Sequence, residues 1–212
     1  MRITVFILTA LFYLNGCSGV QVDSTNSERG DAQPQDGDII FHVSKSSQSK
    51  AIQLATNSKY SHMGIVYVQD NKHYVYEAVQ PVKLTPLDLW IDRGENKHYV
   101  VKRLANSDEV LTPETLMKMK KVGAKYQDKD YDIYFEWSDD RIYCSELVWK
   151  IFKEATDIEI GQLERLGDFN LENEIVQQKI KERYGDKVPL DEQVISPAVM
   201  FNSEKLITVI GG

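Results

Sequence analysis

Cys144 is the residue of this chain with the clearest potential as a nucleophile. It lies at the start of the stretch 143–155, directly after Tyr143, and the apolar residues of this stretch fall on one face of a helix in the strongest amphipathic pattern of the sequence. Unpaired N–H groups and the helix dipole favour an anion at such a position, and thus the thiolate form in which cysteine attacks. A free cysteine can equally be a small core residue. Cys144 lies at the end of the helix away from the apolar face and beside Ser145 and Glu146, so the sequence leaves both interpretations open.

A thiolate nucleophile needs a base, and the base needs an orienting partner. Two apolar runs, 63–68 and 73–79, flank the polar segment 69–72, which predicts a β-hairpin. With an even loop centred between residues 70 and 71, Gly64 faces Glu77, and His62 shares their face of the sheet. The backbones of His62 and Glu77 are then about 7–8 Å apart as diagonal neighbours, within reach of long side chains. An odd loop would place them on opposite faces.

Other interpretations of these polar residues carry weight. A single histidine near a strand end is more often a solvated surface residue, whereas an acid such as Glu77 among apolar neighbours is costly to bury without a partner. Glu146 is better explained as a stabiliser of the first helical turn than as a catalytic acid. We expect three tyrosines either to form the approach to the helix or simply to pack: Tyr126, Tyr131 and Tyr134.

The remaining patterns predict a mixed domain. Thr112 is a helix N-cap followed by proline, so a helix should run from there to about residue 123. Further helices are expected at 47–56 and 171–184, and strands at 37–41, 98–104 and 206–210. The fold class is therefore α+β, with a largely antiparallel sheet packed against the helix that carries Cys144.

The first residues resemble a targeting segment. The apolar run 3–14 follows a basic start and is too short for a bilayer, which needs about 20 residues, so it predicts a signal peptide. The sequence Leu14-Asn15-Gly16-Cys17 resembles a bacterial lipoprotein signal, which would make Cys17 the lipid-bearing first residue after removal of 1–16. A plain signal peptide with an incidental cysteine is the alternative. Residues 17–36 are almost entirely polar and predict a flexible tether, which leaves 37–212 as the folded domain.

Composition narrows the possible partners. The 212 residues carry a net charge of −7, which argues against nucleic acid, and we interpret Lys118, Lys120 and Lys121 as the wet face of a helix. Only two cysteines occur and the four histidines are scattered, so no structural zinc site is expected. The chemistry proposed for the thiol requires no metal or organic cofactor. The sequence does not indicate an oligomeric state.

Four motifs together resemble the YiiX-like members of the NlpC-type papain-like hydrolases, in their circularly permuted form. They are Gly37-Asp38-Ile39-Ile40-Phe41, Tyr60-Ser61-His62-Met63-Gly64-Ile65-Val66, Tyr76-Glu77-Ala78 and Tyr143-Cys144-Ser145-Glu146-Leu147-Val148. The histidine strand here precedes the cysteine helix, which is the permuted order. The resemblance implies Cys144 as nucleophile, His62 as base and Glu77 as the residue that orients the imidazole. It also implies a half-barrel-like sheet of five or six strands against the cysteine helix.

The function implied is that of a cysteine peptidase or amidase acting through a thiol acyl-enzyme. We expect the scissile bond to be an amide, in peptidoglycan-type peptides of the bacterial cell envelope, with the protein held at a membrane by its N-terminal lipid. A lipid ester hydrolase or acyltransferase of the same fold is one alternative, and a non-catalytic envelope binding module is another. Residues 160–194 match the family less well, and we expect them to form an elaboration over the site where substrate preference resides.

Overall fold

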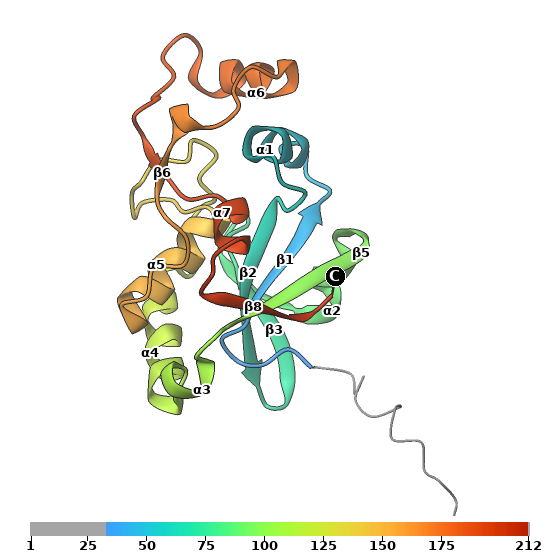
Figure 1. Ribbon diagram of the computed structural model, residues 1–212, viewed down its shortest axis with the longest axis vertical. Coiled ribbons are helices and arrows are strands. Elements are labelled where there is room, and N and C mark those ends of the chain that lie inside the picture. Colours follow the sequence, from blue (N-terminus) through green and yellow to red (C-terminus); the bar gives the residue numbers. More distant parts are fainter. Residues whose placement is uncertain (1–32, 212) are drawn as a thin grey trace, which may run out of the picture. The chain divides into compact units, whose positions relative to one another are not determined.

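The computed structural model describes residues 33–211, which build a six-stranded sheet with helices on both faces (Figure 1). The strand order is β4-β3-β2-β1-β5-β8, and every pairing is antiparallel. The strands are β1 (Ile39–Ser44), β2 (His62–Gln69), β3 (Lys72–Glu77), β4 (Lys83–Pro86), β5 (Gly94–Leu104) and β8 (Leu206–Ile210). This confirms the expected α+β class with an antiparallel sheet.

The β2–β3 hairpin has the predicted register. Ile65 pairs with Tyr76 and Gln69 with Lys72, so the loop consists of Asp70 and Asn71. Both loop residues have positive φ angles, 49° and 58°, the conformation that a two-residue turn adopts between twisted strands. The short polar side chains of aspartate and asparagine tolerate this backbone, which explains why the sequence turns here.

Two separate apolar clusters cover the two faces of the sheet. The larger one packs helices α5 (Cys144–Thr156) and α4 (Pro113–Gly123) against the odd-numbered residues of β1 and β2, among them Phe41, Met63 and Ile65. The smaller one packs Trp90 of α2 (Leu87–Asp92) against Ile40, Val66, Val75 and Val101 on the other face. Side chains of both parities are therefore buried in the central strands.

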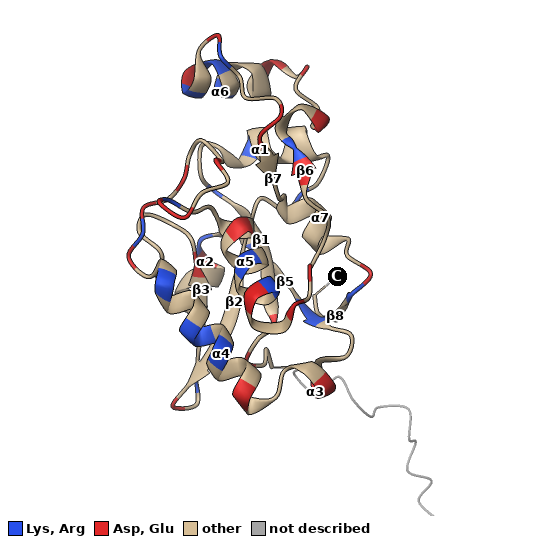
Figure 2. Cartoon of the chain, turned by 90° about the vertical axis from the view of Figure 1, so that its left-hand side faces the viewer, with Lys and Arg blue, Asp and Glu red and all other residues tan. Residues whose placement is uncertain are grey.

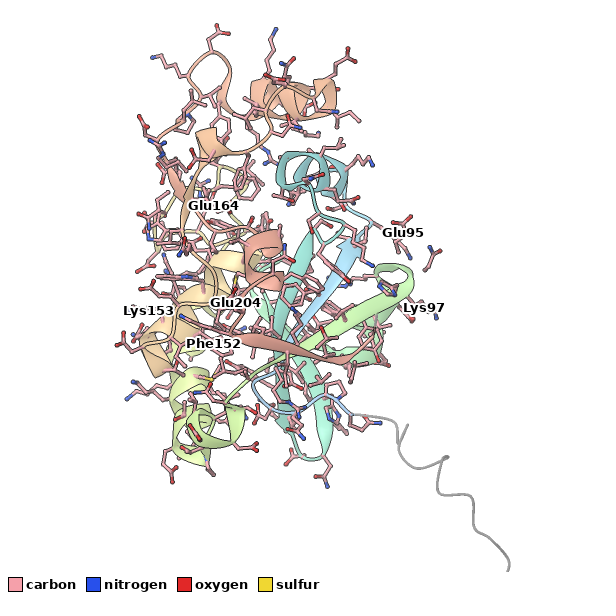
Figure 3. The ribbon with its side chains drawn as sticks, in the orientation of Figure 1. Glu95, Lys97, Phe152, Lys153, Glu164 and Glu204 are labelled. Atoms are coloured by element: carbon pink, nitrogen blue, oxygen red, sulfur yellow. The ribbon has the colours of Figure 1, made fainter. Side chains whose placement is uncertain are left out.

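Helix α5 is the central helix of the larger core. Its residue Phe152 is fully buried, whereas Lys153 next to it points away from the sheet (Figure 3). Helix α4 packs beside α5, and Thr112 caps it by accepting from the backbone N–H of Thr115 at 3.3 Å. The lysines of α4 lie along the helix in Figure 2; Lys118 and Lys121 are exposed, as expected for a wet face.

A smaller layer lies beyond the sheet at the end where β2 begins. Helix α6 (Glu174–Tyr184) packs over α1 (Ser49–Thr56) in Figure 1. A two-stranded ribbon, β6 (Glu164–Arg165) with β7 (Gln193–Val194), connects this layer to the core. The remaining helices are α3 (Ser107–Val110), α7 (Pro197–Phe201) and two short 3₁₀ turns, Ala124–Tyr126 and Leu166–Asp168.

The packed chain begins ahead of the boundary expected at Gly37. Pro34 is buried, and Asp36 forms an ion pair with Lys120 at 2.6 Å. Residues 1–32, with the expected signal peptide, Cys17 and most of the tether, lie outside the described residues. None of the helices within residues 33–211 is long and apolar enough to span a membrane.

Candidate active site

The hairpin brings His62 and Glu77 into direct contact. Nε2 of His62 lies 2.6 Å from Oε2 of Glu77, as the shared face predicts. Gly64 keeps the space between them open: a Cβ there would lie 2.5 Å from Cγ1 of Val75 and 3.3 Å from Cβ of Glu77. The local sequence thus sets both the register and the clearance of this pair.

Glu77 is completely buried, and four donors share its two oxygens. Besides His62, the hydroxyl of Thr85 donates at 2.6 Å, the indole N–H of Trp90 donates at 2.9 Å, and the guanidinium of Arg93 forms an ion pair. Burial raises the pKa of this carboxyl, but His62, Arg93 and Thr85 outweigh it and lower the pKa to about 2. Glu77 is therefore an anion fixed in one orientation.

Cys144 is the first residue of α5 and is buried. Cys144 lies close enough to His62 to influence the pKa of that ring, whereas Nε2 of His62 is bonded to Glu77. Burial alone lowers the pKa of His62, but the hydrogen bonds and charges of Cys144 and Glu77 raise it to about 9. The surroundings of His62 therefore favour a protonated imidazole bonded to the carboxylate of Glu77.

His42 lies beside His62 on the neighbouring strand β1. It is the cross-strand partner of His62, and its ring stacks on that of Trp90 with centroids 3.9 Å apart. Burial, followed by the charge of His62, lowers the pKa of His42 to about 2, so its ring is neutral. A neutral ring packs beside the imidazolium of His62 without repelling it.

Two hollows meet at the site, and one has a more polar lining than the other. A small cavity of about 90 Å³, lined mostly by apolar side chains such as Ile52, Phe135 and Ile180, has Cys144 in its wall. A polar groove of about 780 Å³, with Lys45 and Arg93 among its lining residues, has His62 in its wall. Gln48 and Tyr131 border both hollows and therefore lie between them. The thiol of Cys144 faces the apolar cavity, whereas the imidazole of His62 faces the polar groove.

The structure distributes the other sequence-predicted residues differently. Glu146 is buried and pairs with Lys150 at 2.8 Å within the helix, away from His62. Of the three tyrosines, Tyr131 borders the site, Tyr126 packs in the core, and the ring of Tyr134 packs against Tyr184.

Three partners of Glu77 could not be predicted from the sequence: Thr85, Trp90 and Arg93. They belong to β4, to α2 and to the residue that follows α2, in a segment where only four to six residues form each element. Such short elements show no clear periodicity. The acid within an apolar strand is the one available signal, because it requires buried partners.

Comparison with known proteins agrees with this geometry. Residues 33–210 match the model of a family described as permuted papain-like amidase enzyme, YaeF/YiiX, C92 family. The chain belongs to this family. It is therefore a permuted papain-like cysteine amidase-type hydrolase, and the permuted order and fold class inferred from the sequence are confirmed.

Two relatives of this amidase family illustrate the similarity. The uncharacterized protein YiiX of Escherichia coli (strain K12) is 49% identical over 177 residues, which cover 84% of this chain and 86% of the relative. A crystal structure described as the metalloprotein yiiX from Escherichia coli O157:H7 aligns with a TM-score of 0.81 at 49% identity, covering 85% of this chain and 98% of that one.

That relative is described as a metalloprotein, but the described part of this chain shows no ligand set for a metal ion. Between residues 33 and 211, no group of three or more His, Cys, Asp or Glu side chains is placed to hold a metal ion. The oxygens of Glu77 are already occupied by four donors. These residues do not fit a metal centre.

Proposed function

We propose that this amidase acts through Cys144 as nucleophile, His62 as general base and acid, and Glu77 as the residue that orients the imidazole. The observation that supports these roles best is the bond of His62 to a buried carboxylate with four donors, in a ring whose pKa is also raised by the nearby Cys144. A base held in one tautomer by a third group is the arrangement that activates a thiol.

The proposed reaction follows from this order. The thiolate of Cys144 attacks the amide carbonyl, and the resulting oxyanion lies near the free backbone N–H groups at the start of α5. His62 gives its proton to the leaving nitrogen as the C–N bond breaks. Water, deprotonated by the same imidazole, then releases the acyl group and restores the thiol.

We propose a peptidoglycan-type peptide as the substrate. The polar groove on the His62 side, with Lys45, Asp92 and Arg93 in its wall, suits a leaving group that carries both charges and hydrogen-bonding groups. Because His62 protonates the leaving group, the amine portion belongs in this groove. The acyl portion stays on Cys144 and belongs in the apolar cavity.

The apolar cavity also favours a second candidate, a lipid ester hydrolase or acyltransferase. About 90 Å³ lined by Ile52, Phe135 and Ile180 accommodates a short apolar group. An acyl ester would place its chain there and its alcohol in the groove. Both candidates use the same nucleophile and differ in the bond cleaved.

One experiment separates these substrates and tests the three roles. Purified cell-wall fragments and lipid extracts are digested by the wild type and by Cys144→Ala, His62→Ala and Glu77→Gln, with released amines and acids quantified. We expect Cys144→Ala and His62→Ala to lower kcat/KM by at least about 10³-fold, and Glu77→Gln to be about 10²-fold less severe. Unfolding curves of each variant show whether the fold survives.

The outcomes differ clearly. Release of new amino groups from wall fragments supports the peptide, whereas release of fatty acid alone supports the ester. Near wild-type turnover in His62→Ala would remove His62 from the mechanism. A wild-type thiol that reacts with iodoacetamide no faster than the denatured protein would favour a binding module instead.

A further inference from the structure

Arg93 contacts the buried carboxylate of Glu77 and also lines the polar groove. Its guanidinium forms an ion pair with Oε1 of Glu77, yet 42% of the Arg93 side chain is exposed. A guanidinium has five N–H donors, and within residues 33–211 no other protein group accepts from this one. Glu77 therefore fixes the guanidinium in place while donors remain for a ligand in the groove.

Lys45 is a second cation in the wall of the same groove. Its Nζ donates to the backbone carbonyl oxygen of Asp92 at 3.3 Å, which is a neutral acceptor. Asp92 is the one acidic residue among the described residues that line the groove, and its carboxylate pairs with Lys97 at 2.8 Å instead. In the described part of the chain, no ion pair neutralises the ammonium group of Lys45.

The charges of both cations act inside the groove. The pKa of His42, which also lines the groove, is lowered to about 2, first by burial and next by the charge of His62. The charges of Arg93 and Lys45 add to this lowering. The groove thus has a local excess of positive charge on a chain whose net charge is −7, and this excess favours an anionic ligand.

The rest of the groove suits the carbon chain of an amine. Ala78, Val79 and Ile133 contribute apolar side chains to its lining, and its volume is about 780 Å³. A guanidinium binds a carboxylate through paired, charge-assisted hydrogen bonds, and a lysine ammonium adds a point charge. An amine whose carbon chain ends in a carboxylate would use both kinds of lining.

We propose that the polar groove is a carboxylate-binding subsite for the leaving amine, with Arg93 and Lys45 as the residues that set this specificity. The enzyme then releases an amino acid or peptide that carries a free carboxylate. His62 protonates the leaving nitrogen, whereas Arg93 binds the other oxygen of Glu77, so the carboxylate lies several atoms away from that nitrogen. The C–N bond breaks as described above, and water supplies the new oxygen of the acyl group. This inference rests on the proposed function.

Matched pairs of substrates test the subsite. N-butyryl amides of glycine, γ-aminobutyrate and ε-aminocaproate are compared with the same compounds in which a carboxamide replaces the carboxylate, and the released amine is quantified. For the two longer amines we expect the acid to exceed its carboxamide about 10–100-fold in kcat/KM, chiefly through a lower KM, the usual gain from hydrogen bonds to a charged group. For glycine, whose carboxylate is too close to the nitrogen to reach Arg93, the two should be nearly equal.

Charge variants test which residues produce the preference. The readout is the ratio of kcat/KM for acid over carboxamide within each variant, so a general loss of activity cancels. Lys45→Gln should lower this ratio several-fold, and Lys45→Glu should bring it to about one or below, because the attraction becomes a repulsion. Arg93→Gln should lower the ratio and also kcat on both substrates, since Glu77 loses a donor. Lys50→Gln is the matched control: Lys50 is an exposed lysine of α1 outside the groove, and its variant should keep the wild-type ratio.

The two proposals fail in different ways. A wild-type ratio within about threefold of one at every chain length, with Cys144→Ala inactive, would overturn the subsite and leave the proposed nucleophile standing. A preference that is largest for glycine, or that is the same in Lys45→Glu and Arg93→Gln as in the wild type, would overturn the assignment of these residues. A wild type inactive toward every amide, butyryl p-nitroanilide included, would overturn the proposed function and this inference with it.

Discussion

At the scale of single residues, Glu77 does more than orient an imidazole. Its carboxylate receives donors from β2, from β4, from α2 and from Arg93 just beyond α2, so one buried charge joins the elements around the site. Removing the acceptor would leave several buried donors unpaired, which costs more than the net value of a hydrogen bond. The same contacts that position His62 therefore also contribute to the stability of this region.

The titration of His62 predicts a pH-dependent stability. Its pKa is raised in the folded protein, from an ordinary value of 6.5 to about 9. Its contribution to the free energy of unfolding is therefore fully present below about pH 6.5 and is lost as pH rises through about 9. Urea unfolding of the wild type and of His62→Gln across this range should show a difference in stability that shrinks with rising pH.

The titration of Glu77 predicts how the free energy of unfolding changes on the acid side of the same pH range. Its pKa is lowered from 4.5 to about 2, so its contribution is present above about pH 4.5 and is lost as pH falls toward about 2. A difference between wild type and His62→Gln that stays constant up to pH values above 9 would contradict the ion pair of His62.

At the scale of elements, the β2–β3 hairpin and α5 each position part of the site. The hairpin sets the spacing of His62 and Glu77 through its two-residue turn, and α5 contributes Cys144 at its first residue. His62 is the first residue of β2, where the sheet ends, so its ring can meet the start of the helix. Close contact between β2 and β3 keeps this geometry tight.

Gly64→Ala tests that contact. The backbone of Gly64 is not in the left-handed region, so the effect comes from space: the new methyl group would lie 2.5 Å from Val75 Cγ1 and 2.7 Å from the carbonyl oxygen of Tyr76. We expect a loss of about 1–3 kcal/mol in the free energy of unfolding, as for overpacked cores, and reduced turnover because Glu77 is displaced. Gln69→Ala, at an exposed site on the same strand, is the control. Unchanged stability and activity in Gly64→Ala would show that β3 shifts to accommodate the methyl group without measurable cost.

At the scale of the whole molecule, residues from 157 onward complete the site that the sheet and α5 begin. Helix α6 packs on α1 and carries Arg183 to Gln48, and the segment from Leu166 to Ile195 lines much of the apolar cavity. The expectation that substrate preference resides in 160–194 remains a prediction. Because these residues surround the apolar cavity, substitutions among them can test this prediction of substrate preference.

The N-terminal segment supplies a prediction about location. We propose that the protein is a lipoprotein of the bacterial cell envelope, attached to a membrane through Cys17, because Leu14-Asn15-Gly16-Cys17 resembles a lipoprotein signal. Cys17→Ser should release the protein from membranes in cell fractionation, since a lipid chain could no longer be attached. Activity on a soluble substrate should be unaffected. Finding the wild type entirely in the soluble fraction would contradict the anchor.

The sequence by itself determined those features that depend on neighbours along the chain. The Asp70-Asn71 turn set the register of the hairpin, side-chain alternation then placed His62 and Glu77 on one face, and the amphipathic pattern after Tyr143 put Cys144 at a helix start. Each follows from local backbone preference and periodicity.

Only the tertiary structure decided which distant residues complete the site. Thr85, Trp90 and Arg93 reach Glu77 from short elements without clear periodicity, and Arg183 reaches Gln48 across 135 positions of chain. Long-range contacts of this kind depend on how whole elements pack, which local preference does not encode. The division between the apolar cavity and the polar groove arises for the same reason, because their walls come from segments far apart in sequence.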